Sequence, residues 1–140
     1  MKQIIALFLV VCLLGAIIQP AYAAEPQDVY VTPRYIYIDK CYSEFSINES
    51  TGIATCKAYC YSLDGYTVQV ECKLQRYVGS FWGTIKTWTD TGLEAGLIQE
   101  NWAVYSGYTY RLYTTIKIMN SAGVQIESEV ITKTYSYYPS

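Results

Sequence analysis

Apolar and polar side chains alternate along most of the chain, and eight segments show this period of two. Within residues 67–75, Val68, Val70, Cys72 and Leu74 share one face while polar side chains occupy the other. A period of two is typical of a strand with one buried face. The predicted strands are residues 35–38, 43–48, 52–61, 66–77, 81–89, 97–105, 108–119 and 124–135.

Short turns rich in Gly, Asn, Asp and Ser separate these strands, and a helical turn is expected only near residues 91–96. About seven or eight short strands at this spacing favour an all-β fold, an antiparallel β-sandwich. The chain of 140 residues leaves little room for a second domain. We therefore assign residues 34–140 to a single sandwich and residues 24–33, which hold two prolines, to an N-terminal leader.

The turns set the register of two hairpins. A two-residue Gly-Ser turn at residues 79–80 pairs Tyr77 with Trp82 and Leu74 with Ile85. In the last hairpin, Ile118 opposite Val124 aligns Leu112 with Val130 on the core face. This register leaves the two glutamates at positions 127 and 129 on the outer face.

Aromatic and charged side chains then gather on the outer faces of the middle and late strands. Such a surface stacks against sugar rings or contacts a protein partner, although tyrosine, threonine and lysine also favour strands and solubility. Trp88 is the strongest candidate, because strand propensity explains an exposed indole poorly; the alternative is a plug at the edge of the sandwich. The candidate ligand face comprises Trp88, Trp82, Tyr77, Tyr113, Arg111 and Lys73, with Gln75, Lys86, Lys117, Glu127 and Glu129 around it.

A secretory signal peptide is predicted at residues 1–23. Lys2 gives a positive start, residues 4–18 form an apolar run, and Ala21 and Ala23 supply a site for cleavage after Ala23. The run is shorter than the ~20 apolar residues that a spanning helix needs. We therefore expect a secreted protein that has no membrane partner after cleavage.

Cysteine pairing is predicted from the parity of the strands. One of the five cysteines leaves with the signal peptide, and an even set in an exported chain favours disulfides. If Ile47 lies opposite Ala54, the pairs are Cys41–Cys60 and Cys56–Cys72; a slip of four residues gives Cys41–Cys56 and Cys60–Cys72 instead. The spacing of the cysteines lacks the paired C-x2-C motifs of zinc ribbons, so no metal site is expected.

Composition restricts the chemistry further. The chain has no histidine, which excludes histidine-liganded zinc and histidine-dependent nucleophiles. Its net charge of −2 offers no basic footprint for nucleic acid. Asp64, Asp90 and Glu94 lie near predicted loops, and nothing in the sequence brings two of them together as a glycosidase would require. We expect neither enzymatic activity nor a cofactor.

Several short motifs, namely residues 54–56, 70–75, 82–88 and 107–112 and Gly123 followed by Glu127, resemble an uncharacterised family of small secreted proteins from Gram-positive anaerobic bacteria. The likeness spans roughly residues 41–135. It implies an immunoglobulin-like or fibronectin-III-like sandwich of unknown activity. Tyr110-x-Leu112 also resembles the tyrosine corner of such sandwiches, with Leu112 where antibody domains have their second cysteine.

Two functions follow as hypotheses. The first is a secreted binding module that recognises a glycan or a cell-surface protein through the aromatic face. The alternative is a structural or assembly protein of the cell envelope or extracellular matrix, in which edge strands pair between copies and no small ligand is bound.

Overall fold

The structure, a computed structural model, describes residues 35–138, which lie in one compact unit that begins at Pro33. The predicted signal peptide and leader fall outside these residues. The strands are β1 (Ile38–Asn48), β2 (Ile53–Ser62), β3 (Thr67–Val78), β4 (Phe81–Leu93), β5 (Ala95–Ala103), β6 (Tyr108–Met119) and β7 (Gln125–Tyr137). This part of the chain contains no helix, and so none that spans a membrane.

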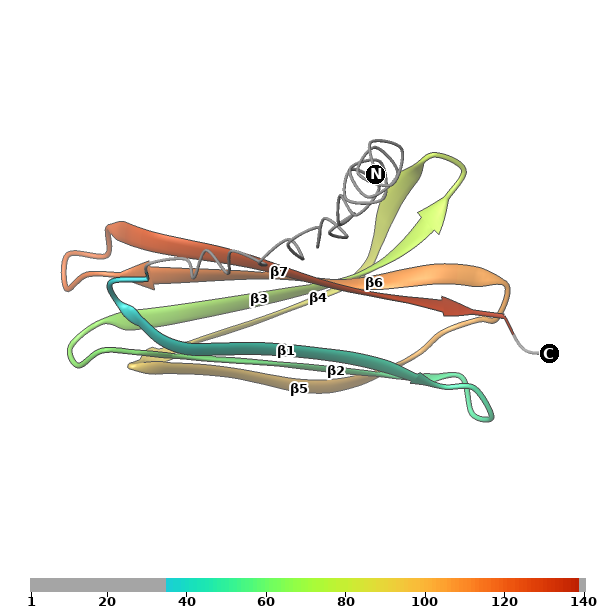
Figure 1. Ribbon diagram of the computed structural model, residues 1–140, viewed down its shortest axis with the longest axis horizontal. Coiled ribbons are helices and arrows are strands. Elements are labelled where there is room, and N and C mark those ends of the chain that lie inside the picture. The colour runs from blue at the N-terminus through green and yellow to red at the C-terminus, as the bar shows by residue number, and fades with distance from the viewer. Residues whose placement is uncertain (1–34, 139–140) are drawn as a thin grey trace, which may run out of the picture. The chain divides into compact units, whose positions relative to one another are not determined.

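Two antiparallel sheets form the layers of a sandwich (Figure 1), with strand orders β1-β2-β5 and β4-β3-β6-β7. The predicted all-β fold is confirmed, with seven strands because the first two predicted segments join into β1. The helical turn expected near residues 91–96 is wrong. There the chain passes directly from β4 to β5 through Glu94, whose φ of 64° lies in the left-handed region.

The core lies between the inner faces of the sheets, where the alternating residues of the sequence pattern meet. Leu74, Leu112 and Ile116 from the larger sheet are fully buried, as are the small residues Ala54 and Cys56 on β2. β4 and β5, the edge strands of different sheets, contact each other along one side of the sandwich, and β1 contacts β7 along the other. Both open sides are therefore closed by contacts between sheets.

The register of the first hairpin is confirmed. Ile47 pairs with Ala54 and Cys41 with Cys60. Cys41 and Cys60 lie directly opposite each other on neighbouring strands, and their sulfur atoms form a disulfide.

The register of the second hairpin holds only near its turn. Tyr77 pairs with Trp82 as predicted, but Leu74 pairs with Lys86 because Ile85 is an extra residue in a β-bulge. One extra residue moves every later side chain of β4 to the opposite face. Ile85, predicted to enter the core, is 39% exposed, while Lys86 and Trp88 turn inward.

The register of the last hairpin is also wrong, by three residues. Its turn closes between Asn120 and Val124 rather than between Ile118 and Val124, and a bulge at Ile126 adds one residue more. Ile118 therefore pairs with Glu127, and Val130 is 47% exposed.

Glu127 and Glu129 consequently lie on the inner face, at the side where β7 meets β1. The Glu127 carboxylate accepts hydrogen bonds from the main-chain N–H groups of Ile36, Tyr37 and Ile38, at 3.0, 2.8 and 3.1 Å. This carboxylate satisfies three donors at the start of β1, which explains why an acidic residue faces inward here.

The predicted tyrosine corner is present. The buried Tyr110 hydroxyl, near the start of β6, donates a hydrogen bond of 2.7 Å to the carbonyl oxygen of Tyr105 in the β5–β6 connection. Leu112, two residues further, is fully buried. The bond fixes the connection against the second sheet, beside the site described next.

Candidate functional site

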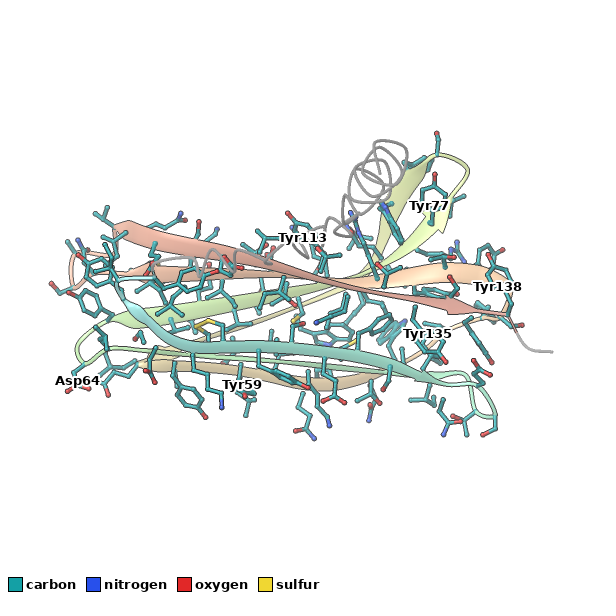
Figure 2. All side chains as sticks on the ribbon, in the orientation of Figure 1. Tyr59, Asp64, Tyr77, Tyr113, Tyr135 and Tyr138 are labelled. Atoms are coloured by element: carbon teal, nitrogen blue, oxygen red, sulfur yellow. A yellow bond between two sulfur atoms is a disulfide. The ribbon has the colours of Figure 1, made fainter. Side chains whose placement is uncertain are left out.

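Four residues of the predicted ligand face do come together, on the outer side of the β4-β3-β6-β7 sheet. The Arg111 guanidinium lies over the ring of Trp82, 4.3 Å from its centroid, and 5.3 Å from the ring centroid of Tyr113. Tyr77 packs against Trp82 with 5.1 Å between centroids. Figure 2 shows Tyr77 on the part of the β3–β4 hairpin that turns away from the sandwich, and Tyr113 on the same outer side.

Arg111 and Lys73, the two cations of the predicted ligand face, already have partners. Arg111 Nε donates to Gln75 Oε1 at 2.7 Å, and Lys73 forms an ion pair with Glu71 at 2.8 Å. The hydrogen bond to Glu71 raises the pKa of Lys73. Trp82 is also covered by Arg111, so this face offers a ligand few unpaired groups.

Trp88 is absent from the outer face, contrary to the prediction. It lies opposite the fully buried Cys72 in the β3–β4 ladder and packs, partly buried, against the core. Residues directly opposite each other share a face, and the bulge at Ile85 determines which face that is. The alternative interpretation of Trp88, as a plug at the sandwich edge, matches its position.

Near its turn the β3–β4 hairpin diverges from the sandwich (Figure 1). A pocket lies between residues of this hairpin and the end of β5. Its volume is about 460 Å³, within the size range of small-molecule sites. We call it the edge pocket, and it is lined by Arg76, Thr84, Ile85, Trp102, Ala103, Val104, Tyr105 and Tyr110. None of these residues belongs to the predicted ligand face.

Arg76 brings a positive charge into the edge pocket. It pairs with Tyr110 across β3 and β6, both facing inward, and its guanidinium lies over the Tyr108 ring at 4.5 Å from the centroid. The Arg76 Nε atom is buried and has no hydrogen-bond partner within residues 35–138. The covered Nε is out of a ligand's reach, so the terminal amino groups of Arg76 are the donors that this residue can offer to the pocket.

Aromatic rings border the other side of the edge pocket. Trp102 on β5, 37% exposed, pairs with the buried Ala54 and so faces inward, while the Tyr105 side chain is 78% exposed. The Lys86 ammonium lies 4.9 Å from the Trp102 ring centroid, and the rings of Trp88 and Trp102 meet edge to face at 6.3 Å. Burial raises the pKa of Tyr110, which keeps its hydroxyl neutral.

The alternation of inward and outward residues along β3 was enough to indicate the Arg76 side of the edge pocket. Arg76 continues the even-numbered, inward series of Leu74, and a charged residue in a core series is a common sign of a site. The other side required the topology, because only the packing of β4 against β5 brings Trp102 near Arg76.

Of the two predicted disulfides, Cys56–Cys72 is wrong. Cys41–Cys60 is formed, whereas Cys56 and Cys72 are free and fully buried thiols. They lie on strands of different sheets, β2 and β3, and their sulfur atoms are not joined. The Cys72 sulfur lies 3.5 Å from Thr114 Oγ1, which also hydrogen-bonds Ser43 Oγ at 3.0 Å.

If the predicted signal peptide, and with it Cys12, has been removed, reduction is expected to add about two hydrogens to the intact mass. Iodoacetamide should label Cys56 and Cys72 only after unfolding. Burial raises the pKa of Cys56 to about 12, and the thiolate is the reactive form. Mass spectrometry gives both the hydrogens gained on reduction and the number of labelled cysteines. A gain of about four hydrogens would contradict the free thiols.

The same pKa shift gives a pH dependence. Because folding raises the pKa of Cys56 from 9.0 to about 12, this thiol contributes its full stability below about pH 9. The contribution declines as the pH rises from there towards 12, since the unfolded chain loses the proton first.

Two of the three carboxylates considered for catalysis accept hydrogen bonds from the main chain. Asp90 accepts the main-chain N–H of Leu97 at 2.8 Å, and Glu94 accepts that of Gly65 at 3.0 Å. Asp64 lies exposed in the turn between β2 and β3. Over residues 35–138 no group of three potential metal-ligating side chains occurs.

No protein-family model, curated protein or solved structure matches this chain.

Proposed function

We propose that the protein is a secreted recognition module that binds a glycan in the edge pocket. The observation that carries the proposal is the Arg76 guanidinium in the lining of a cavity bordered by the aromatic residues Trp102 and Tyr105. Protein sites for sugars combine a few fixed polar groups with aromatic faces, and the edge pocket has both. The outer face predicted from the sequence is less suitable, because Arg111 covers Trp82.

The surroundings of the pocket support binding rather than catalysis. Its lining residues supply a guanidinium, hydroxyl groups and apolar surface, and none is a carboxylate, a histidine or a thiol. The acid–base groups in the lining are therefore limited to two tyrosine hydroxyls, and that of Tyr110 already donates to the Tyr105 carbonyl. The signal sequence and the Cys41–Cys60 disulfide support export to an oxidising compartment.

An immunoglobulin-like or fibronectin-III-like assignment fits the same proposal. Its support is the division of seven antiparallel strands into sheets of three and four, together with the Tyr110 corner. In such sandwiches the loops and edges carry recognition while the sheets provide a rigid scaffold.

The experiment is a calorimetric titration with neutral and acidic cell-wall oligosaccharides, using two matched tyrosine variants. Tyr105→Ala removes an exposed ring at the pocket but keeps the main-chain carbonyl that Tyr110 needs. We expect it to weaken glycan binding roughly three- to tenfold, and Tyr77→Ala on the outer face to leave it unchanged.

Two outcomes would overturn this assignment. Weaker binding by Tyr77→Ala, with Tyr105→Ala unaffected, would move the site to the outer face. Absence of glycan binding together with a mass that rises with concentration would favour the assembly protein instead.

A further inference from the structure

The edge pocket is positive in an acidic chain. The whole sequence carries a net charge of −2, yet the pocket lining contains Arg76 and no carboxylate, and Lys86 lies over Trp102 at its border. Within the described part of the chain neither cation forms an ion pair; the ion pair there joins Lys73 and Glu71. The lining thus holds one cation, and a second lies against the lining residue Trp102.

The way Arg76 is held favours a planar anion. The guanidinium lies over Tyr108, and its Nε is covered, so a ligand in the pocket would meet the terminal amino groups of Arg76. A carboxylate can accept two parallel N–H···O bonds from the end of a guanidinium. Lys86 adds a second charge from β4, where the bulge at Ile85 turns this lysine inward, over Trp102.

Taking the glycan-binding function as given, we propose that the edge pocket selects acidic sugars, with the uronic acid carboxylate on Arg76 and the sugar ring against Trp102 or Tyr105. A sugar fits better than the carboxyl end of a peptide. Protein sites for peptide termini use consecutive main-chain N–H groups, whereas the cationic donor here is a side chain that lines the pocket together with aromatic rings. Sugar rings present C–H faces that such rings can cover.

The test compares two matched ligands and two matched arginines. The probes are trigalacturonic acid and the neutral galactose trisaccharide of the same linkage, titrated calorimetrically into the protein. Arg76→Gln keeps a polar, hydrogen-bonding side chain but removes its charge and shortens it. Arg111→Gln does the same to an arginine that also stacks on an aromatic ring, on the outer face of the same sheet.

We expect the acidic trisaccharide to bind at least about tenfold more tightly than the neutral one, since hydrogen bonds to charged groups are the strong ones. Arg76→Gln should abolish this preference while weakening the neutral ligand little, and Arg111→Gln should preserve it. Lys86→Gln should reduce the preference by a smaller factor. Thermal unfolding of each variant establishes that it is folded.

Each contrary outcome has a distinct meaning. Equal affinity for both trisaccharides, with Tyr105→Ala weakening both, overturns acid selectivity but leaves the proposed function standing. Failure of all glycans to bind overturns both. Binding of a peptide with a free C-terminus but not of its amidated form, lost in Arg76→Gln and without uronate binding, overturns the sugar in favour of a peptide.

Discussion

Replacing Trp88 with alanine is expected to lower the free energy of unfolding by about 2–4 kcal/mol. The indole lies on the inner face of β4, against the core and against the edge of Trp102. Removing it opens a void where the two sheets meet and removes apolar contacts that the surrounding strands cannot replace without moving. The estimate is below the value for a fully buried tryptophan, because Trp88 is only partly buried.

The matched control is Trp82→Ala, which removes an indole of the same size from the outer face. Its ring touches Tyr77 and Arg111 rather than the core, so the expected loss is about 1 kcal/mol. Urea unfolding followed by circular dichroism measures both variants. A smaller loss of unfolding free energy in Trp88→Ala than in Trp82→Ala would indicate that Trp88 is exposed and would contradict the bulge at Ile85.

The fate of Trp88 shows why register was the weakest part of the sequence prediction. Strand positions followed from alternation, and the first hairpin was predicted correctly because its turn has no bulge, so Ile47 meets Ala54. In β4 and β7 a bulge adds a residue that alternation does not reveal, since Ile85 and Ile126 look like ordinary strand residues. One odd shift exchanges the two faces of a strand.

Sequence reasoning placed residues of neighbouring strands together correctly, but it did not find the residues that meet from different sheets. Tyr77, Trp82, Arg111 and Tyr113 meet across neighbouring strands close to a two-residue turn, and sequence reasoning placed them together. The edge pocket combines Arg76 with Trp102, which lie on different sheets. Their proximity depends on which edge strands face each other, and alternation within a strand carries no information about that.

Replacing Cys41 and Cys60 together with serine is expected to lower the free energy of unfolding by about 3 kcal/mol under oxidising conditions. The disulfide joins residues 19 apart in sequence, and closing a loop of that length restricts the unfolded chain by about this amount. Reductant provides the control: it should destabilise the natural protein by a similar amount and leave the double variant unchanged, because Cys56 and Cys72 have no bond to lose. Chemical unfolding with and without reductant measures all four values. A loss of stability in the reduced double variant would reveal a second disulfide, and equal stability of the oxidised proteins would mean that Cys41 and Cys60 are not joined.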